Sequence, residues 1–440
     1  MVSSNTLYVG LDFSRKHVQV VMLNAEGRAL GRSHNLLNTY PGYEQFKTLL
    51  QEHMQAAHAE HLVVGGEATS YYWLPYFQQF SRDPFWEAMD FIPYLLNARW
   101  MRWFKKGRTP THKDDDIDAE EIGQYVRIQP PATPWQLDEH WLSLRLLTRL
   151  RYHLVHSLAR EKNLAQLYLF LLRPSYTTYR PFANVFGVTS QQVLTGAEGT
   201  EELEDLPIEE LALALQKLSG NRLPNPQANA KDLLLEIRDR FPLSEALQRP
   251  LQIILNVLIE TIRHLETDID QIDTLITQQV QAEGYPELGY LQSIPGIGPV
   301  LASSIAVEIG DIARFSDPLK WDKSKRCLRK RTHTEVNDAV HKYAGLWWRH
   351  IQSGEFTADE RRLSREGNSY LRYALIQAAE RMRLCIPSFA SYYQKKKTQA
   401  VRHAHKRALT LTASKVLDLC VILLLHKENY QAKEENGSLA

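Results

Sequence analysis

Acidic side chains near the N-terminus stand at the ends of apolar runs. Asp12 follows the apolar run 7–11, and Glu67 comes shortly after the run 62–64. A charge removed from water is costly unless it is paired or coordinates a metal. Each carboxylate is therefore either a surface residue at a strand end or a ligand for something cationic.

A third acidic group places four aspartates within positions 114–118. Asp115 and Asp118 are three residues apart, so they share one face if a helix begins early. Helix capping and the helix dipole explain single acidic residues such as Asp114 or Asp116. Four carboxylates this close repel one another unless a divalent cation neutralises them. The three acidic groups together predict a Mg²⁺ site of the kind that acts on phosphodiesters.

A glycine-containing turn opens the C-terminal part of the chain. The segment 293–299 contains Gly296 and Gly298 and precedes the apolar run 300–309, which predicts a helix–hairpin–helix. Its glycines would let backbone N–H groups approach a nucleic-acid phosphate. The alternative is a tight turn used only for helix packing.

A loop serine is the remaining candidate for chemistry. Ser353 lies in a Q-S-G sequence, without a G-x-S-x-G elbow or a pairing that would indicate a hydrolase triad. Downstream, Arg365, Asn368 and Arg372 surround the start of a helix predicted over 370–384. They either position a phosphate or serve as ordinary helix-start and surface residues.

The elements that must position the carboxylates alternate between strands and helices, which predicts an α/β sheet. In open α/β sheets, active sites gather where strands end, so Asp12 and Glu67 are expected to converge. The predicted elements are a hairpin over 7–23, a strand over 30–36, a helix over 41–58, a strand at 62–64, a helix over 71–80, a strand over 91–96 and a helix over 118–127.

The rest of the chain is predicted to be helical. Long helices are expected over 135–170 and 250–281, with heptad-like spacing that favours pairing with each other or with a second chain. A helical, Pro-punctuated segment, 174–242, separates them. A basic helix with an apolar face is predicted over 395–425, and residues from Ala432 onward are predicted to be disordered.

The charge is uneven although the formal net charge is only +1. Segments 105–113, 320–331 and 395–407 are basic, and segment 198–210 is acidic. Each basic segment either binds phosphate backbones or forms a solvated helix face. Three separated cysteines give no C-x-x-C pair and argue against zinc ribbons and disulfide scaffolds. We found no signal-peptide pattern and no membrane span, so we expect a cytoplasmic protein that does not act at a membrane.

Seven short motifs follow one another along nearly the whole chain. They are G-L-D-F-S from Gly10, G-E-A-T-S-Y-Y from Gly66, K-D-D-D-I-D-A from Lys113, I-P-G-I-G-P from Ile294, Y-A-G-L from Tyr343, Q-S-G from Gln352 and E-G-N-S-Y-L-R from Glu366. In this order they resemble the DEDD-type transposases of bacterial insertion sequences, now described as bridge-RNA-guided serine recombinases.

The resemblance implies an architecture of three parts. These are a RuvC-like (RNase H-like) α/β domain over 1–130, a helical coiled-coil linker over 131–285, and a mainly α-helical transposase domain with the helix–hairpin–helix over 286–431, before a tail over 432–440. It also implies a bacterial, nucleoid-associated protein.

The resemblance further implies a mechanism. The acidic tetrad would be Asp12, Glu67, Asp115 and Asp118, holding Mg²⁺ or Mn²⁺, and Ser353 would be the nucleophile. Gly296, Gly298, Arg365, Asn368 and Arg372 would contact nucleic acid. A structured noncoding bridge RNA would pair with donor and target DNA, and strands would be exchanged through a phosphoserine intermediate and a Holliday junction. Active sites would be composite, built from two protomers within a tetramer.

Two features depart from the family's pattern. A longer basic segment, 321–337, separates Arg314-Phe315 from the Y-A-G-L motif, and Trp347-Trp348 stands where the family has a proline. Both lie in the region that leads to Ser353.

Three other functions fit parts of the sequence. A metal-dependent nuclease resembling a Holliday-junction resolvase would use the same carboxylates with water as nucleophile, leaving Ser353 structural. A non-enzymatic nucleic-acid-binding protein would use only the helix–hairpin–helix and the basic helices. An actin-like ATPase would share the first hairpin, but the Gly-rich phosphate loops of that class are missing.

Overall fold

The computed structural model describes residues 5–108, 115–131, 133–136, 138–196, 203, 206–317, 319–322, 325–348, 352–353, 356–357, 363–364 and 366–432. Side chains are described for all of these except 107–108, 115, 283, 352–353 and 356–357. The chain divides into two compact units: Met1–Leu142 with Ala313–Thr332, and Ser143–Ile312 with His333–Ala440. Each unit is described by itself.

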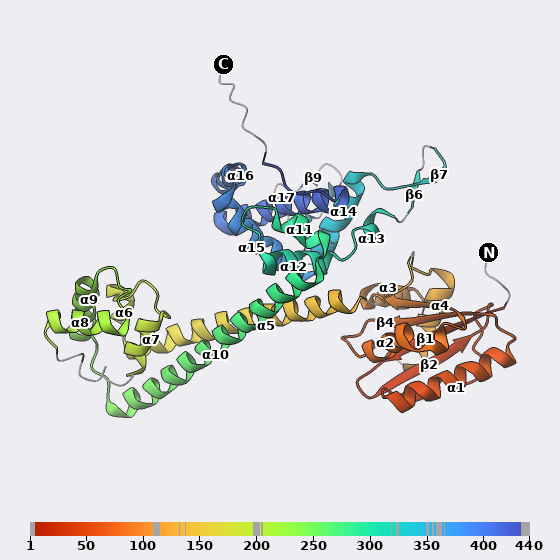
Figure 1. Ribbon diagram of the computed structural model, residues 1–440, viewed down its shortest axis with the longest axis horizontal. Helices are drawn as coiled ribbons and strands as arrows, with labels where there is room; N and C mark the ends of the chain where they lie inside the picture. The colour runs from red at the N-terminus through yellow and green to blue at the C-terminus, as the bar shows by residue number, and fades with distance from the viewer. Residues whose placement is uncertain are drawn as a thin grey trace, which may run out of the picture. The chain divides into compact units, whose positions relative to one another are not determined.

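The first unit is built on a five-stranded sheet of order β3-β2-β1-β4-β5 (Figure 1). The central strand β1 (Thr6–Phe13) pairs antiparallel with β2 (His17–Leu23), which pairs antiparallel with β3 (His34–Leu37). On its other side β1 pairs parallel with β4 (His61–Glu67), and β4 pairs parallel with β5 (Asp90–Leu96). The mixed α/β sheet predicted for this part of the chain is therefore confirmed.

The prediction of a strand over 30–36 is wrong in its first half. Strand β3 begins only at His34, and Gly31 has a φ of +88°. That left-handed conformation belongs to turns rather than to strands, and a glycine adopts it without steric strain.

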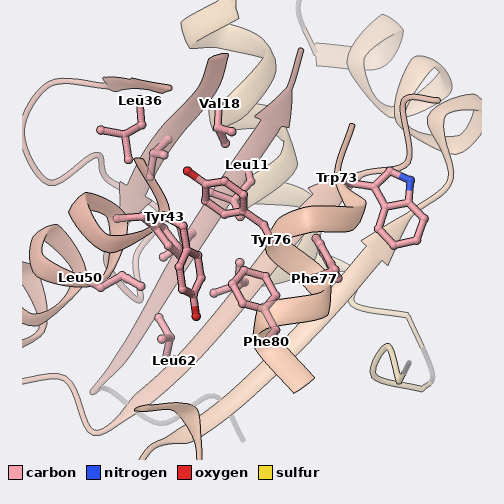
Figure 2. Close-up of a cluster of buried hydrophobic side chains, with 14 of the residues drawn as sticks. Leu11, Val18, Leu36, Tyr43, Leu50, Leu62, Trp73, Tyr76, Phe77 and Phe80 are labelled. Atoms are coloured by element: carbon pink, nitrogen blue, oxygen red, sulfur yellow. The ribbon is translucent and has the colours of Figure 1, made fainter. Parts of the chain in front are cut away.

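One face of the sheet is covered by α1 (Tyr40–Ala56) and α2 (Leu74–Arg82). Alternate residues of the strands point into this face, so Leu11 and Leu62 meet aromatic rings of both helices (Figure 2). The helix α1 begins where the Thr39 hydroxyl accepts a hydrogen bond from the backbone N–H of Gly42, with Pro41 in the first turn. This aromatic core fixes the sheet that carries the candidate carboxylates.

The opposite face of the sheet is covered by α4 (Asp115–Ile128), which α3 (Ala98–Arg108) packs against. Helix α4 starts three residues earlier than the predicted start at Asp118, and no helix was predicted where α3 lies. The first unit also contains η1 (Pro84–Trp86), α13 (Ala313–Ser316), and a small antiparallel hairpin of β6 (Lys320–Asp322) and β7 (Cys327–Arg329).

Two long helices dominate the second unit, α5 (Glu139–Leu172) and α10 (Glu245–Glu283), and they confirm the predicted pair of long helices. They lie side by side and run in opposite directions (Figure 1). The direction follows from the hydrogen bonds between them, in which residues further along α5 contact residues earlier on α10. These contacts join Ser143 to Gln279, Arg151 to Asp273, and Lys162 to Glu266. The coiled-coil geometry stays a prediction.

The chain between the long helices forms a small helical cluster. It contains α6 (Tyr176–Tyr179), α7 (Val188–Thr195), α8 (Ile208–Leu218) and α9 (Pro226–Arg238), packed around a core of aliphatic and aromatic side chains. The helical character predicted for 174–242 is confirmed.

The C-terminal part is mainly helical, as predicted. Its elements are α11 (Pro286–Gln292), α12 (Pro299–Ile309), α14 (His333–Ala344), the two-residue strands β8 (Gln352–Ser353) and β9 (Phe356–Thr357), α15 (Ser369–Cys385), α16 (Pro387–Thr398) and α17 (Ala404–His426). The predicted tail beyond residue 432 lies outside the described residues, and the domain boundaries at 130 and 285 stay predictions.

The single basic helix predicted over 395–425 is wrong. Helix α16 ends at Thr398, and α17 begins after His403, which has a left-handed φ of +50°. The two helices pack against each other, and the Tyr393 hydroxyl lies 2.7 Å from Nδ1 of His405. Tertiary packing therefore breaks a segment that contains no glycine or proline to announce the break.

Helix α17 is long and apolar enough to cross a membrane by length and composition, and half of its most apolar stretch is buried inside the protein. A core helix meets the same criteria. Asp418 on α17 is hydrogen-bonded by His341 and Asn337 of α14 and by Lys415. Burial alone would raise the pKa of Asp418, but these hydrogen bonds hold that pKa well below its ordinary value.

Candidate functional site

Strands β1 and β4 bring two of the predicted acidic residues to the same edge of the sheet. Gly10 of β1 pairs with Gly65 of β4, and the register continues so that Asp12 and Glu67 stand two residues further along each strand. Because side chains alternate along a strand, each carboxylate lies on the same sheet face as its glycine. The parallel register therefore places Asp12 and Glu67 on one face of adjacent strands.

Both glycines face α4. A Cβ on Gly10 would lie 1.9 Å from the carbonyl oxygen of Ala119, and a Cβ on Gly65 would lie 2.7 Å from Val126. The glycines thus allow α4 to lie closer to the sheet than any side chain would permit. This close approach brings the first turn of α4, with its aspartates, beside the strand ends.

Contacts from β2 support this placement. Gln19 is directly opposite Asp12 in the β1–β2 ladder, and its side-chain amide donates a hydrogen bond to Asp116 of α4. Since Gln19 and Asp12 share a sheet face, the Asp12 side chain lies on the face that α4 covers. Asp116, which capping or the helix dipole was expected to explain, instead ties α4 to β2.

Lys105 joins two acidic residues from different elements. Its ammonium lies 3.0 Å from a carboxylate oxygen of Glu67 and 3.0 Å from one of Asp118, and all three side chains are largely buried. Burial alone would lower the pKa of Lys105, but the hydrogen bonds and charges of Asp118 and Glu67 raise it. The two carboxylates therefore converge on one buried cation.

The four predicted acidic residues are placed as follows. Glu67 and Asp118 meet at Lys105, and Asp12 lies on the neighbouring strand and on the same face. Asp115 is the first residue of α4, and its side chain lies outside those described. Among the described side chains, no group of three or more His, Cys, Asp or Glu is close enough to hold a metal.

The donor set nevertheless suits a hard divalent cation. The carboxylates of Glu67 and Asp118 each place one oxygen 3.0 Å from the Lys105 ammonium. In sites that bind phosphate, Mg²⁺ is typically held by one or two carboxylates together with phosphate and water oxygens. Glu67 and Asp118 would hold such an ion, with Asp12 on the neighbouring strand.

The predicted nucleophile is carried by a short hairpin in the second unit. Ser353 ends β8, which pairs antiparallel with β9, and its side chain is not among those described. The loop is closed at its base by a bridge between Trp348 and Leu363 and by a hydrogen bond from the Ser364 N–H to the Trp347 carbonyl. Trp347 and Trp348 therefore form part of the base of this loop.

Two glycines beside that base pack backbone against backbone. Gly345 ends the helix α14 with a φ of +70°, and Gly367 precedes α15 with a φ of +121°. A Cβ on Gly367 would lie 2.6 Å from the amide nitrogen of Gly345. The Y-A-G-L and E-G-N motifs thus meet in space, because only glycines allow this contact.

Asn368 and Arg372 have structural partners here. The Asn368 side chain caps α15 by accepting hydrogen bonds from the N–H groups of Tyr370 and Leu371, and it donates to Glu308 at 2.6 Å. Arg372 donates to the carbonyl of Ala344 at 3.3 Å. Their predicted phosphate contacts stay predictions, and Arg365 lies outside the described residues.

Glu308, at the end of α12, is buried. Its carboxylate accepts hydrogen bonds from Asn368 and from Arg149 of α5, and the two bonds from Arg149 are 2.6 and 2.9 Å long. Burial alone would raise the pKa of Glu308, but these donors hold it below its usual range. Arg149 also lies over the ring of Tyr370, 4.6 Å from its centroid. This network fixes α15, and with it the E-G-N motif, against α5 and α12.

The predicted helix–hairpin–helix turn is flanked by helices α11 and α12. Gly296 has a φ of +93° and lies against α15, where a Cβ would be 3.3 Å from Arg381 and Cys385. Gly298 caps α12 and faces open space. Packing therefore explains Gly296, whereas a phosphate contact at either glycine stays a prediction.

From the sequence, Lys105 was placed only within a basic segment and was not predicted as a site residue. The spacing of Met101, Phe104 and Lys105 at i, i+3 and i+4 nevertheless indicates that the three residues share one face of a helix. That spacing predicts a helix which turns the lysine toward the sheet.

Comparisons with known proteins match two parts of the chain. Residues 9–174 match the family model DEDD_Tnp_IS110, described as a transposase, and residues 289–320 and 328–394 match the model of the transposase IS116/IS110/IS902 family. No curated protein matches the chain. The first matched segment contains most of β1 together with β4, α3 and α4, and the second contains the glycine turn, the hairpin of β8 and β9, and α15.

Proposed function

Because the chain belongs to the IS110 family of DEDD transposases, we propose that the acidic residues of β1, β4 and α4 form a metal-dependent DNA-cleavage centre. The family makes the protein an enzyme that cuts and rejoins DNA. The observation that carries the assignment is the convergence of Glu67 and Asp118 on the Lys105 ammonium. Two carboxylates from distant parts of the chain are already arranged around one positive charge.

In this proposal Asp12, Glu67, Asp115 and Asp118 hold Mg²⁺, or Mn²⁺ in its place. Ions held by these residues would supply positive charge to stabilise the scissile phosphate and the departing 3′ oxygen. The protein's own contribution is geometric: the sheet register and the approach of α4 at Gly10 set the spacing of the carboxylates. Lys105 would leave its shared position when the ions and the phosphate arrive.

Ser353 supplies the nucleophile in this proposal. Its hydroxyl attacks the phosphorus, the bond from phosphorus to the 3′ oxygen breaks, and the hydroxyl proton passes to the departing 3′ oxygen. The resulting phosphoserine keeps the energy of the phosphodiester, so a 3′ hydroxyl from another strand can displace the serine and rejoin the DNA. The support is the family membership and the position of Ser353 at the end of β8.

Recognition of the DNA is proposed to depend on a structured guide RNA that pairs with donor and target. Two protomers of a tetramer would combine their acidic centre and serine hairpin into one composite active site. Support comes from the resemblance of the motifs to bridge-RNA-guided recombinases. The glycine turn at Gly296 and Gly298 and the basic segments would bind nucleic-acid backbones, and that affinity would weaken with salt.

The acidic centre is tested by cleavage assays on element-end DNA with Mg²⁺ and RNA transcribed from the element flanks. Glu67→Gln and Asp118→Asn should each reduce cleavage at least about 100-fold, since each removes a metal ligand. The matched control is Asp90→Asn, since Asp90 pairs with His61 at the opposite edge of the same sheet. Wild-type cleavage by either ligand variant would overturn the proposal.

The serine step is tested by trapping. Wild-type protein, DNA, RNA and Mg²⁺ are combined, and mass spectrometry searches for DNA attached to Ser353. The adduct should vanish in Ser353→Ala and Asp115→Ala but persist in Ser388→Ala, which alters an exposed serine of the same part of the chain. Cleaved DNA without an adduct would instead identify a metal-dependent nuclease that uses water as nucleophile.

A further inference from the structure

Helix α3 packs against α4 in the first unit (Figure 1), and its two faces differ in exposure and composition. Its inner face carries Met101, which is fully buried, and Phe104, whose ring packs edge-on against Tyr125 of α4 at 5.0 Å. The same side carries Lys105, which contacts the two carboxylates of the acidic centre. The inner face therefore fixes α3 at the border of the candidate cleavage site.

The outer face carries two tryptophans and two cations, Trp100, Trp103, Arg102 and Lys106, which we call the α3 platform. Trp100 is 60% exposed and Trp103 is 65% exposed. They are three residues apart, so their rings are neighbours on the helix surface. The Lys106 ammonium lies 5.8 Å from the centroid of the Trp103 ring. Aromatic rings and positive charge are thus combined on one surface.

The composition of α3 argues against burial of this face in a protein core. Residues 98–108 include five Lys or Arg and no Asp or Glu. Single exposed hydrophobic residues are common on proteins, but adjacent exposed tryptophans among cations are the combination that binds single-stranded nucleic acid. The rings stack on bases, and the cations follow the phosphate backbone.

The occupant we infer is DNA. The family acts on DNA, and the platform shares a helix with a residue that contacts the acidic centre. Trp103 and Lys105 are two residues apart, a rise of about 3 Å along a helix. The two side chains lie on opposite faces of α3, which is about 10–12 Å across with its side chains, so a strand bound on the platform would pass around this one helix to reach the acidic centre.

We propose that the α3 platform stacks unpaired bases of the DNA substrate and thereby leads the scissile strand into the acidic centre. The identity of the strand rests on the proposed function, whereas the stacking surface rests on the exposure and spacing of the tryptophans. The two faces of α3 then act together. DNA binds to the outer face, and this binding positions it for the carboxylates that contact Lys105 on the inner face.

The test measures binding of fluorescein-labelled DNA with an unpaired stretch by fluorescence anisotropy, without RNA and with EDTA present. Trp100→Ala and Trp103→Ala should each weaken binding about tenfold or more, and the Phe variants should retain most of the affinity. Arg102→Ala should remove about one phosphate contact, so the slope of the logarithm of the binding constant against the logarithm of the salt concentration should become shallower by about 1. Tyr40→Ala is the matched control, since Tyr40 is 63% exposed on α1 of the same unit.

The Glu67→Gln variant separates this inference from the proposed function. Its DNA binding should still weaken when Trp100 or Trp103 is replaced by alanine, while its cleavage is lost. If wild-type protein fails to cleave but binding still depends on both tryptophans, the stacking surface stands and the cleavage centre fails. The inference is overturned if Trp100→Ala/Trp103→Ala binds DNA as tightly as Tyr40→Ala does. It is also overturned if that double variant loses affinity only for RNA of the same sequence.

Discussion

The closest approach between α4 and the sheet offers a sharp test of how the acidic centre is assembled. In Gly10→Ala, the new Cβ would stand 1.9 Å from the Ala119 carbonyl oxygen and 2.6 Å from the Gly123 amide nitrogen. Ordinary contacts lie near 3.5 Å, so α4 must move away from β1 by about 1.5 Å. Both atoms in the way belong to the helix backbone, so no side chain can rotate to make room.

This displacement has two expected consequences. Overpacking of this kind should lower the free energy of unfolding by about 1–3 kcal/mol, measured by urea denaturation. Because Asp118 moves with α4 while Glu67 stays on β4, the single-turnover rate of DNA cleavage should fall about 100-fold, as expected for a misplacement of about 1 Å. The rate should fall by more than the fraction of folded protein does, so unfolding alone cannot account for the lost cleavage.

Gly65→Ala is the matched comparison, because Gly65 pairs with Gly10 in the same ladder and faces the same helix. The atoms nearest to its Cβ would be side-chain carbons, those of Val126 at 2.7 Å and Ile122 at 3.2 Å. These can shift, so both stability and cleavage should fall less than in Gly10→Ala. Equal effects of the two substitutions, or an unaltered cleavage rate in Gly10→Ala, would refute the packing argument.

Three further predictions concern charged groups. Arg149→Met leaves the buried Glu308 without its main partner and should cost about 3–5 kcal/mol, whereas Arg160→Met, which removes an exposed arginine paired with Glu161, should leave the thermal midpoint nearly unchanged. The folded-state pKa of Glu308 should then be raised, so the Arg149→Met variant should regain thermal stability as the pH is lowered through that pKa, and a flat profile would contradict this. Because the folded-state pKa of Asp418 is lowered, its contribution should be present above about pH 4 and lost as pH falls further; Asp418→Asn should flatten this acid limb in a urea series. Lys105→Ala removes the ammonium shared by two carboxylates, so the thermal midpoint should fall without metal and rise more with Mn²⁺ than in the wild type.

The positions of the secondary structure elements near the acidic centre were largely predictable from the sequence. The hairpin at β1 and β2, the strands β4 and β5, and the placement of Asp12 and Glu67 near strand ends follow from local apolar runs and their interruption by charge. These are properties of short segments, so no knowledge of distant residues is needed to predict them. The order of the motifs likewise identified the family before any geometry was considered.

Contacts between distant segments could not be predicted in this way. The convergence of Glu67 and Asp118 on Lys105 depends on the parallel register of β1 and β4 and on the approach that Gly10 allows. The use of Asn368 as a cap bound to Glu308 depends equally on how helices pack. Local pattern determines which segments become strands or helices, whereas register and packing through space determine which of their side chains meet, because each contact depends on the joint fit of residues far apart in the chain.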